Sequence, residues 1–130
     1  MEDSIMSKER SLFCAVNRKE DEAESGLKEK HVPVLHVPDT VEAGKAFDVK
    51  IDCWGDGKHP NEHGHFIQWV ELYAGEVFLS RVEFTAVVTQ PVATVPVTVY
   101  HPGEATLRAI SRCNLHGLWE GSVTVTAKEA

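Results

Sequence analysis

The chain has no long hydrophobic run. The apolar stretches among its 130 residues are far shorter than the roughly 20 residues that a membrane span needs. Its start, MEDSIMSKERSLFC, contains no apolar run that could serve as a secretion signal. These absences predict a soluble, cytoplasmic protein with no membrane partner.

Cysteine and positive charge are both scarce. Cys14, Cys53 and Cys113 are odd in number and widely spaced, which argues against a disulfide framework and for a reducing compartment. The chain has 20 acidic and 13 basic residues, and its net charge is −7. Nucleic-acid phosphates require a basic face, so we expect no nucleic-acid partner. A glycine-rich nucleotide loop is also missing.

The first residues contain little apolar material. The segment RKEDEAESGLKEK is dominated by charge and cannot form a core of its own. We interpret residues 1–28 as a short N-terminal extension, partly helical at most, and residues 29–130 as one domain. Cys14 is interpreted as a small hydrophobe that packs on the domain or on a neighbouring subunit.

From His31 onward the apolar residues recur with period two. Phe47, Val49, Ile51 and Cys53 alternate with charged residues, which is typical of a half-buried strand. Further short runs read HVPVLHV, HFIQWVELYA, VFLSRVEFT, ATVPVTVY, ATLRAISR and GSVTVTA. Seven strands without a long helix predict an all-β fold, a β-sandwich. Pro96 cannot donate to a ladder, so its strand is expected at an edge or with a bulge.

Histidine is abundant, and several histidines lie where strands should begin or end. These are His31, His59, His65 and His116, the last of them three residues after Cys113. Loops at one end of a sandwich can bring such residues together. Imidazole and thiolate together favour a transition metal and disfavour magnesium or calcium. Zinc, copper and iron all fit this donor chemistry.

The number of donors helps to separate these metals. A structural zinc site closes at four ligands, whereas four imidazoles and one thiolate make five and leave one octahedral position open. An open position on a redox-active ion favours a catalyst. The main alternative is a copper electron-transfer site, but its usual axial methionine is lacking after Cys113, because Met1 and Met6 are the only methionines. A zinc-stapled binding domain is a third possibility.

Three blocks of sequence resemble a known family. EKHVPV (Glu29 to Val34), KHPNEHGHFIQWVEL (Lys58 to Leu72) and CNLHGLWE (Cys113 to Glu120) look like superoxide reductases of the neelaredoxin and desulfoferrodoxin group. The resemblance implies an immunoglobulin-like, seven-stranded antiparallel β-sandwich with one mononuclear iron per chain. It also implies one-electron reduction of superoxide to hydrogen peroxide, an external electron donor such as rubredoxin, and a homotetramer.

The resemblance implies a role for particular residues. The iron ligands would be His31, His59, His65 and His116 in the equatorial plane and Cys113 on the axis. Glu29 and Lys30 match a glutamate and a lysine beside the open position, where Glu29 would ligate oxidised iron and Lys30 would attract superoxide. Cys14 alone cannot supply the second iron site of two-iron members, so a one-iron enzyme is expected.

One departure from the family concerns the loop His63-Gly64-His65. The family often has two adjacent histidines there. The spacing from His59 and from Ile67 favours His65 as the ligand, with His63 as the alternative that flexible Gly64 allows. We expect backbone N–H groups near Asn114 and Leu115 to hydrogen-bond the Cys113 sulfur. Two aromatic residues, Trp69 and Trp119, are expected in the sandwich or around the metal, and Cys53 in the core.

Overall fold

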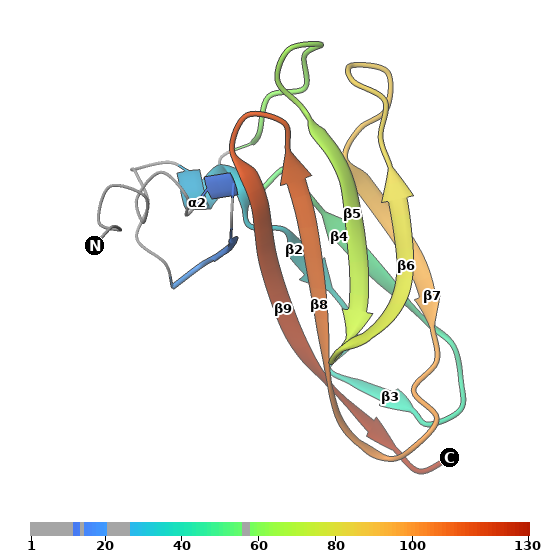
Figure 1. Ribbon diagram of the computed structural model, residues 1–130. Coiled ribbons are helices and arrows are strands. Elements are labelled where there is room, and N and C mark those ends of the chain that lie inside the picture. Colours follow the sequence, from blue (N-terminus) through green and yellow to red (C-terminus); the bar gives the residue numbers. More distant parts are fainter. Residues whose placement is uncertain (1–11, 14, 21–26, 56–57) are drawn as a thin grey trace, which may run out of the picture.

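Two β-sheets lie face to face in the computed structural model, which describes residues 12–13, 15–20, 27–55 and 58–130 (Figure 1). The larger sheet has the strand order β1-β9-β8-β5-β6, with β3 also paired to β9, and the smaller sheet has the order β2-β4-β7. The elements are β1 (Val16–Arg18), α2 (Leu27–His31), β2 (Val34–His36), β3 (Thr40–Glu42), β4 (Phe47–Asp52), β5 (Ile67–Ala74), β6 (Val77–Glu83), β7 (Val92–Val97), β8 (Gly103–Cys113) and β9 (Gly117–Lys128). The predicted all-β sandwich is confirmed.

The described residues form two strands more than the predicted seven. Both of them, β1 and β3, pair with β9 in parallel, whereas the other strand pairs are antiparallel. Each has three residues, which is too short for a period of two to show in the sequence. Strand β1 lies within residues 1–28, the segment interpreted as an extension that is partly helical at most. The presence of a strand there corrects this interpretation. Cys14 lies outside the described residues.

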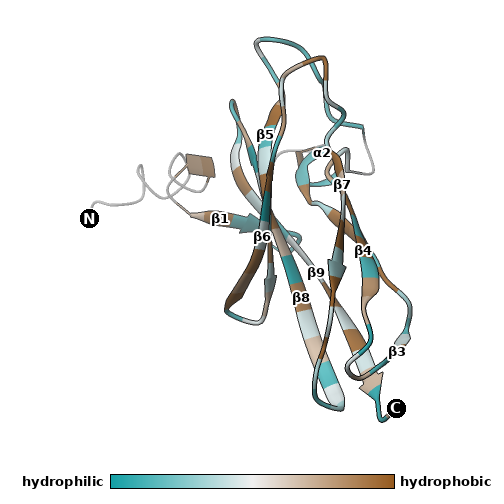
Figure 2. Cartoon of the chain, turned by 90° about the vertical axis from the view of Figure 1, so that its right-hand side faces the viewer, coloured by the Kyte–Doolittle hydropathy of each residue, from teal (hydrophilic) through white to brown (hydrophobic). Residues whose placement is uncertain are grey.

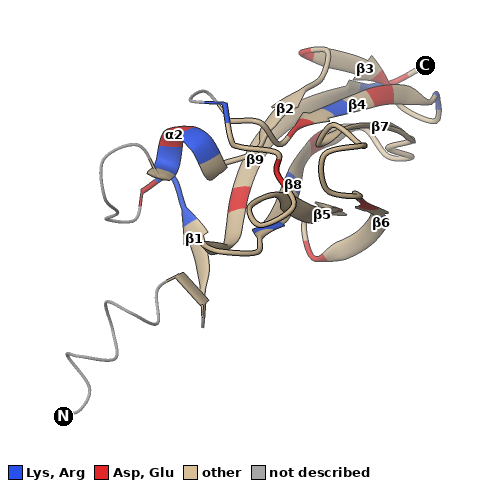
Figure 3. Cartoon of the chain, turned by 90° about the horizontal axis from the view of Figure 1, so that it is seen from above, with Lys and Arg blue, Asp and Glu red and all other residues tan. Residues whose placement is uncertain are grey.

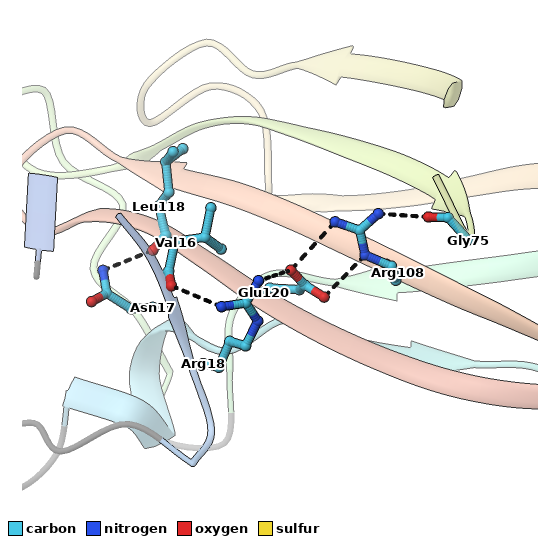
Figure 4. A network of polar contacts seen from close by, with 7 residues as sticks. All are labelled: Val16, Asn17, Arg18, Gly75, Arg108, Leu118 and Glu120. Atoms are coloured by element: carbon cyan, nitrogen blue, oxygen red, sulfur yellow. Dashed lines mark hydrogen bonds and ion pairs between the residues drawn. The ribbon is translucent and has the colours of Figure 1, made fainter. Parts of the chain in front are cut away.

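Strand β1 is tied to the sheet by side chains as well as by its backbone (Figure 4). The Asn17 amide donates to the Leu118 carbonyl at 2.8 Å. Arg18 pairs with Glu120 at 3.3 Å, and Glu120 also accepts from Arg108 at 3.1 Å. The extension is therefore continuous with the larger sheet next to the turn that joins β8 to β9.

The core lies between the two sheets and follows the alternation of the strands (Figure 2). Val49, Ile51 and Cys53 are fully buried on one side, and Val70 and Leu107 are fully buried on the other. Complete burial of one such aliphatic side chain contributes about 1.5–3 kcal/mol. Burial also raises the pKa of the Cys53 thiol, in keeping with the prediction that Cys53 is a core residue.

Pro96 lies in β7, at the edge of the smaller sheet, opposite Asp48 of β4. A residue without an N–H is tolerated on an edge strand because its outer side needs no ladder bond. The predicted edge position is confirmed. Within the described part of the chain, no helix is both long and apolar enough to span a bilayer.

Candidate metal centre

Four histidine side chains form a closed ring at one end of the sandwich. The ring centroids of His31 and His59 are 4.6 Å apart, those of His59 and His65 4.6 Å, those of His65 and His116 5.1 Å, and those of His116 and His31 4.8 Å. Each imidazole therefore contacts two neighbours, and the interplanar angles lie between 60° and 81°. The four rings thus form a closed cycle of contacts.

Three separate segments supply these histidines. His31 is the last residue of α2, His59 and His65 lie between β4 and β5, and His116 lies in the turn between β8 and β9. Gly55 lets α2 approach this end, because a Cβ there would collide with the backbone carbonyls of Glu29 and Lys30. Its φ of 69° is also a conformation that favours glycine.

Cys113 ends strand β8 and is fully buried beside the ring. Its Sγ lies 3.1 Å from His59 Nε2 and 3.6 Å from His116 Nδ1. The ligand atoms of His31, His65, Cys113 and His116 all lie within 4.8 Å of one another. The structure thus brings together all five donors that the sequence indicated, with His59 joined to the group through its contact with the sulfur.

The outer nitrogens of two rings are held by backbone carbonyls. His31 Nδ1 donates to Leu27 O at 2.7 Å, and His59 Nδ1 donates to Pro60 O at 2.6 Å. These bonds fix the tautomer and leave each Nε2 without a proton. Sequence reasoning missed both carbonyls. The first has a simple signal in hindsight, since Leu27 stands four residues before His31 in a helix.

The inner nitrogens fit a metal ion. His31 Nε2 and His65 Nε2 are buried without a hydrogen-bond partner, a situation that costs about 1–3 kcal/mol for a polar atom. A bound cation would satisfy both nitrogens. Imidazole nitrogen and thiolate sulfur are ligands of zinc, copper and iron, so the donor set suits a transition metal.

Burial keeps the imidazoles in the form that binds metals. It lowers the pKa of His31 and of His59 to about 4, and it also lowers the pKa of His65. Neutral imidazole offers a lone pair at neutral pH, so protons do not compete with a metal there. Neighbouring positive charge acts in the same direction, because Lys30 lowers the pKa of both His59 and His65.

Backbone donors from the turn after Cys113 surround its sulfur. Burial raises the pKa of the Cys113 thiol, while N–H groups of Leu115 and His116 oppose this by bonding the sulfur. The expectation of backbone donors near Asn114 and Leu115 is therefore met, with Leu115 and His116 as the residues that supply them. The Asn114 N–H donates instead to Phe66 O at 3.2 Å, because the turn packs against the chain that leads into β5.

The two tryptophans lie in different places. Trp119 is buried beside the histidine ring, where it stacks on His31 and donates to His116 O at 2.9 Å. Trp69 is only half-buried, and the Arg81 guanidinium lies 4.2 Å from its ring. Trp119 therefore matches the expectation of packing around the metal, whereas Trp69 is covered by a surface arginine.

The charged candidates Glu29 and Lys30 are exposed and lie in α2 directly before His31; Figure 3 shows the charged residues of this helix. Lys30 acts electrostatically on two of the histidines, as described above. Glu29 is not part of the ligand group and lines a cavity of about 630 Å³ together with Arg18, Lys28 and Glu120. His63 is exposed and takes no part in the ring.

The protein is thus a β-sandwich that gathers four histidines and one cysteine at one end, where they form a candidate site for a transition metal. Residues 23–122 match the family described as desulfoferrodoxin, and the chain belongs to this family.

Named relatives agree with this assignment. A superoxide reductase of Pyrococcus furiosus is 37% identical over 115 residues, which cover 75% of this chain and 89% of the relative. A neelaredoxin of Megalodesulfovibrio gigas is 36% identical over 118 residues, which cover 77% of this chain and 89% of the relative. The solved superoxide reductase (neelaredoxin) of Ignicoccus hospitalis has a TM-score of 0.73 and 33% identity, and the match covers 87% of this chain and 95% of that structure.

Proposed function

We propose that this protein is a superoxide reductase that binds one iron per chain. It would convert superoxide, one electron and two protons into one molecule of hydrogen peroxide. The observation that carries the proposal is the closed ring of four imidazoles with the Cys113 sulfur beside it. The similarity to superoxide reductases over most of the chain supports it.

Each ligand has an assigned atom. His31, His59 and His65 would bind iron through Nε2, because the Nδ1 atoms of His31 and His59 are engaged by carbonyls and the Nε2 of His65 is buried without a partner. His116 would bind through Nδ1, which faces the sulfur of Cys113. Iron held by these residues would supply the electron that reduces superoxide.

Cys113 and its surroundings tune this centre. A thiolate ligand raises electron density on a metal, as the axial thiolate does for haem iron. The N–H groups of Leu115 and His116 hydrogen-bond the sulfur and moderate its donation. Burial of Cys113 also keeps water from competing for the sulfur.

Lys30 and Glu29 would act beside the metal site. Superoxide is an anion and the protein has a net charge of −7, so a local positive charge is needed for efficient capture. Lys30 is exposed and its charge acts on two histidines of the ring, which supports this role. Glu29, its neighbour on α2, would offer a carboxylate to the centre after oxidation.

The reaction also requires a partner. One external electron is consumed for each superoxide, and the described residues contain one group of metal ligands. A small electron carrier such as rubredoxin is therefore proposed as donor. We further propose a cytoplasmic homotetramer in which residues 29–130 form the iron domain and residues 1–28 an extension, since all five ligands follow residue 28.

Metal analysis with a visible spectrum tests the function most directly. One iron per chain and a thiolate-to-iron band on oxidation support the proposal, together with superoxide-dependent bleaching of the reduced protein. Intense blue copper colour would indicate electron transfer instead. Colourless protein with one zinc would indicate a structural site and would contradict the proposal.

A further inference from the structure

One loop carries two histidines, and only one of them lies in the ring. His63 and His65 flank Gly64, yet His65 lies 4.6 Å from His59 between ring centroids and His63 is exposed. Gly64 does not decide between them, because a Cβ at this position would meet nothing within 4 Å. Some other contact must fix the register of this segment.

The Asn114 side chain holds the backbone on both sides of His65. Its Oδ1 accepts from the Phe66 N–H at 2.9 Å, and its Nδ2 donates to the Gly64 carbonyl at 2.9 Å. The backbone adds a third bond, from Asn114 N–H to Phe66 O at 3.2 Å. Both ends of the amide are thus engaged by the residues next to His65.

The backbone of the same segment closes a tight turn. Glu62 N–H donates to His65 O at 2.9 Å, and His65 N–H donates to Glu62 O at 3.0 Å. His63 and Gly64 are therefore the two residues at the tip of this turn, while His65 lies at its base. The base of the turn carries the histidine that lies in the ring, and the hydrogen bonds of Asn114 hold the turn at this base.

Asn114 is also the residue after Cys113, so it links two ligand-bearing segments directly. Its bonds run to residues 48 and 50 positions away, which distinguishes them from the local bonds of an ordinary turn-forming asparagine. These bonds hold Gly64 and Phe66 beside Cys113. The backbone around His65 therefore has fewer conformations to lose when a metal binds.

We infer that Asn114 is a positioning residue that selects His65, and rejects His63, as the ligand from this loop. The inference rests on the metal site proposed above, but not on the reaction. With Asn114 in place, His63 is kept at the tip of the turn. Without it, the flexible Gly64 lets either imidazole reach the centre.

Cobalt binding tests this selection without any activity measurement. Metal-free protein is titrated with Co²⁺ in competition with a chelator, and the ligand-field and thiolate-to-cobalt bands are recorded. Asn114→Ala should weaken cobalt binding by about 10-fold, the lower end of the usual effect of a residue that orients a metal ligand. Asn114→Asp keeps the acceptor for Phe66 but cannot donate to Gly64, so it should have an intermediate effect and covers the case in which Asn114→Ala folds poorly.

A double-mutant cycle of Asn114→Ala and His63→Ala measures whether Asn114 selects between the two histidines. In the parent protein, His63→Ala should change the cobalt affinity less than about 2-fold. In the Asn114→Ala variant it should weaken cobalt binding by more than about 3-fold, because His63 then shares the ligand role. Equal effects of His63→Ala in both backgrounds would overturn the inference.

Asn61→Ala is the matched control. Asn61 lies in the same loop. Its side-chain amide also accepts from one backbone group, the Val87 N–H, and donates to another, the Thr89 carbonyl, but these bonds do not flank His65. In a double-mutant cycle, the effects of Asn61→Ala and His63→Ala on cobalt affinity should be additive. If Asn61→Ala produces the same coupling, loop stability is responsible and Asn114 has no selective role. A parent protein that binds cobalt but does not reduce superoxide would contradict the proposed function and leave the role of Asn114 intact.

Discussion

The indole of Trp119 lies nearly parallel to the imidazole of His31, with ring centroids 5.0 Å apart and an interplanar angle of 25°. The same indole donates to the His116 carbonyl at 2.9 Å. One buried side chain therefore supports two opposite segments of the candidate centre, α2 and the β8–β9 turn. His31 and His116 are themselves in contact, so the indole restricts the position of one against the other.

Replacing Trp119 by Phe should loosen this support. The variant keeps an aromatic ring near His31 but leaves the His116 carbonyl without its donor, which costs about 1–3 kcal/mol. Urea denaturation of the metal-free protein measures this loss, and a cobalt spectrum measures the change at the ligands. Trp69→Phe is the control, since Trp69 packs against Arg81 and not against a ligand. An unchanged cobalt spectrum in Trp119→Phe would contradict the supporting role.

Cys113→Ser should keep the sandwich and lose the thiolate-to-metal band. A serine hydroxyl is not ionised at neutral pH and is a poor ligand for a soft transition metal. Circular dichroism reports the fold, and the visible spectrum of the iron protein reports the ligand. Cys53→Ala is the control, because Cys53 is a buried core residue and its loss should leave the band in place. A persistent band in Cys113→Ser would exclude Cys113 as a ligand.

The stability of the metal-free protein should fall in acid. Burial lowers the pKa of His31 and His59 to about 4 in the folded protein, whereas the unfolded chain takes up these protons near ~6.5. Between these values the unfolded state binds more protons, so the free energy of unfolding decreases as the pH falls from about 6.5 to about 4 and levels off below. Denaturation at several pH values measures the slope of the free energy of unfolding against pH. His59→Gln should make it shallower, and an unaltered slope would rule out His59 as a contributor.

Lys30→Ala should slow the second-order reaction of reduced protein with superoxide and leave the iron content unchanged. A positive charge on the approach path raises the rate of encounter with an anion, and salt screens it over a length of about 8 Å at physiological ionic strength. Pulse-generated superoxide measured over a range of salt concentrations tests this. Lys30→Arg should keep most of the rate, and Lys45→Ala, at an exposed position between β3 and β4, should keep all of it. Equal rates for Lys30→Ala and the parent at low salt would refute steering by Lys30.

Glu29→Ala should act only on the oxidised state. A hard carboxylate prefers Fe(III) to Fe(II), so its removal should shift the visible band of the oxidised protein and leave the superoxide reaction of the reduced protein nearly unchanged. The comparison of oxidised spectra at neutral pH checks this. Identical spectra would show that Glu29 does not reach the metal and serves only the cavity that it lines.

The sequence by itself determined seven strands of the sandwich and indicated five candidate metal donors. Val49, Ile51 and Cys53 face the core because consecutive side chains of a strand point to opposite faces, a rule that needs no knowledge of the partner strand. These five candidates could be named because strand ends meet at one end of a sandwich and because their motifs resemble those of the family. The resemblance favoured His65 over His63, because its spacing from His59 and Ile67 matches the family's pattern, and the structure places His65 in the ring.

Only the tertiary structure decided which contacts orient those donors. Strand β1 exists because Val16–Arg18 finds the edge of β9, about 100 residues away, and not because its own sequence favours a strand. The bonds of Asn114 to the residues beside His65 and the stacking of Trp119 on His31 likewise join segments far apart in the chain. A hydrogen bond or ring contact depends on distance and direction to within fractions of an ångström, and local sequence patterns do not carry that information until the sheets have packed.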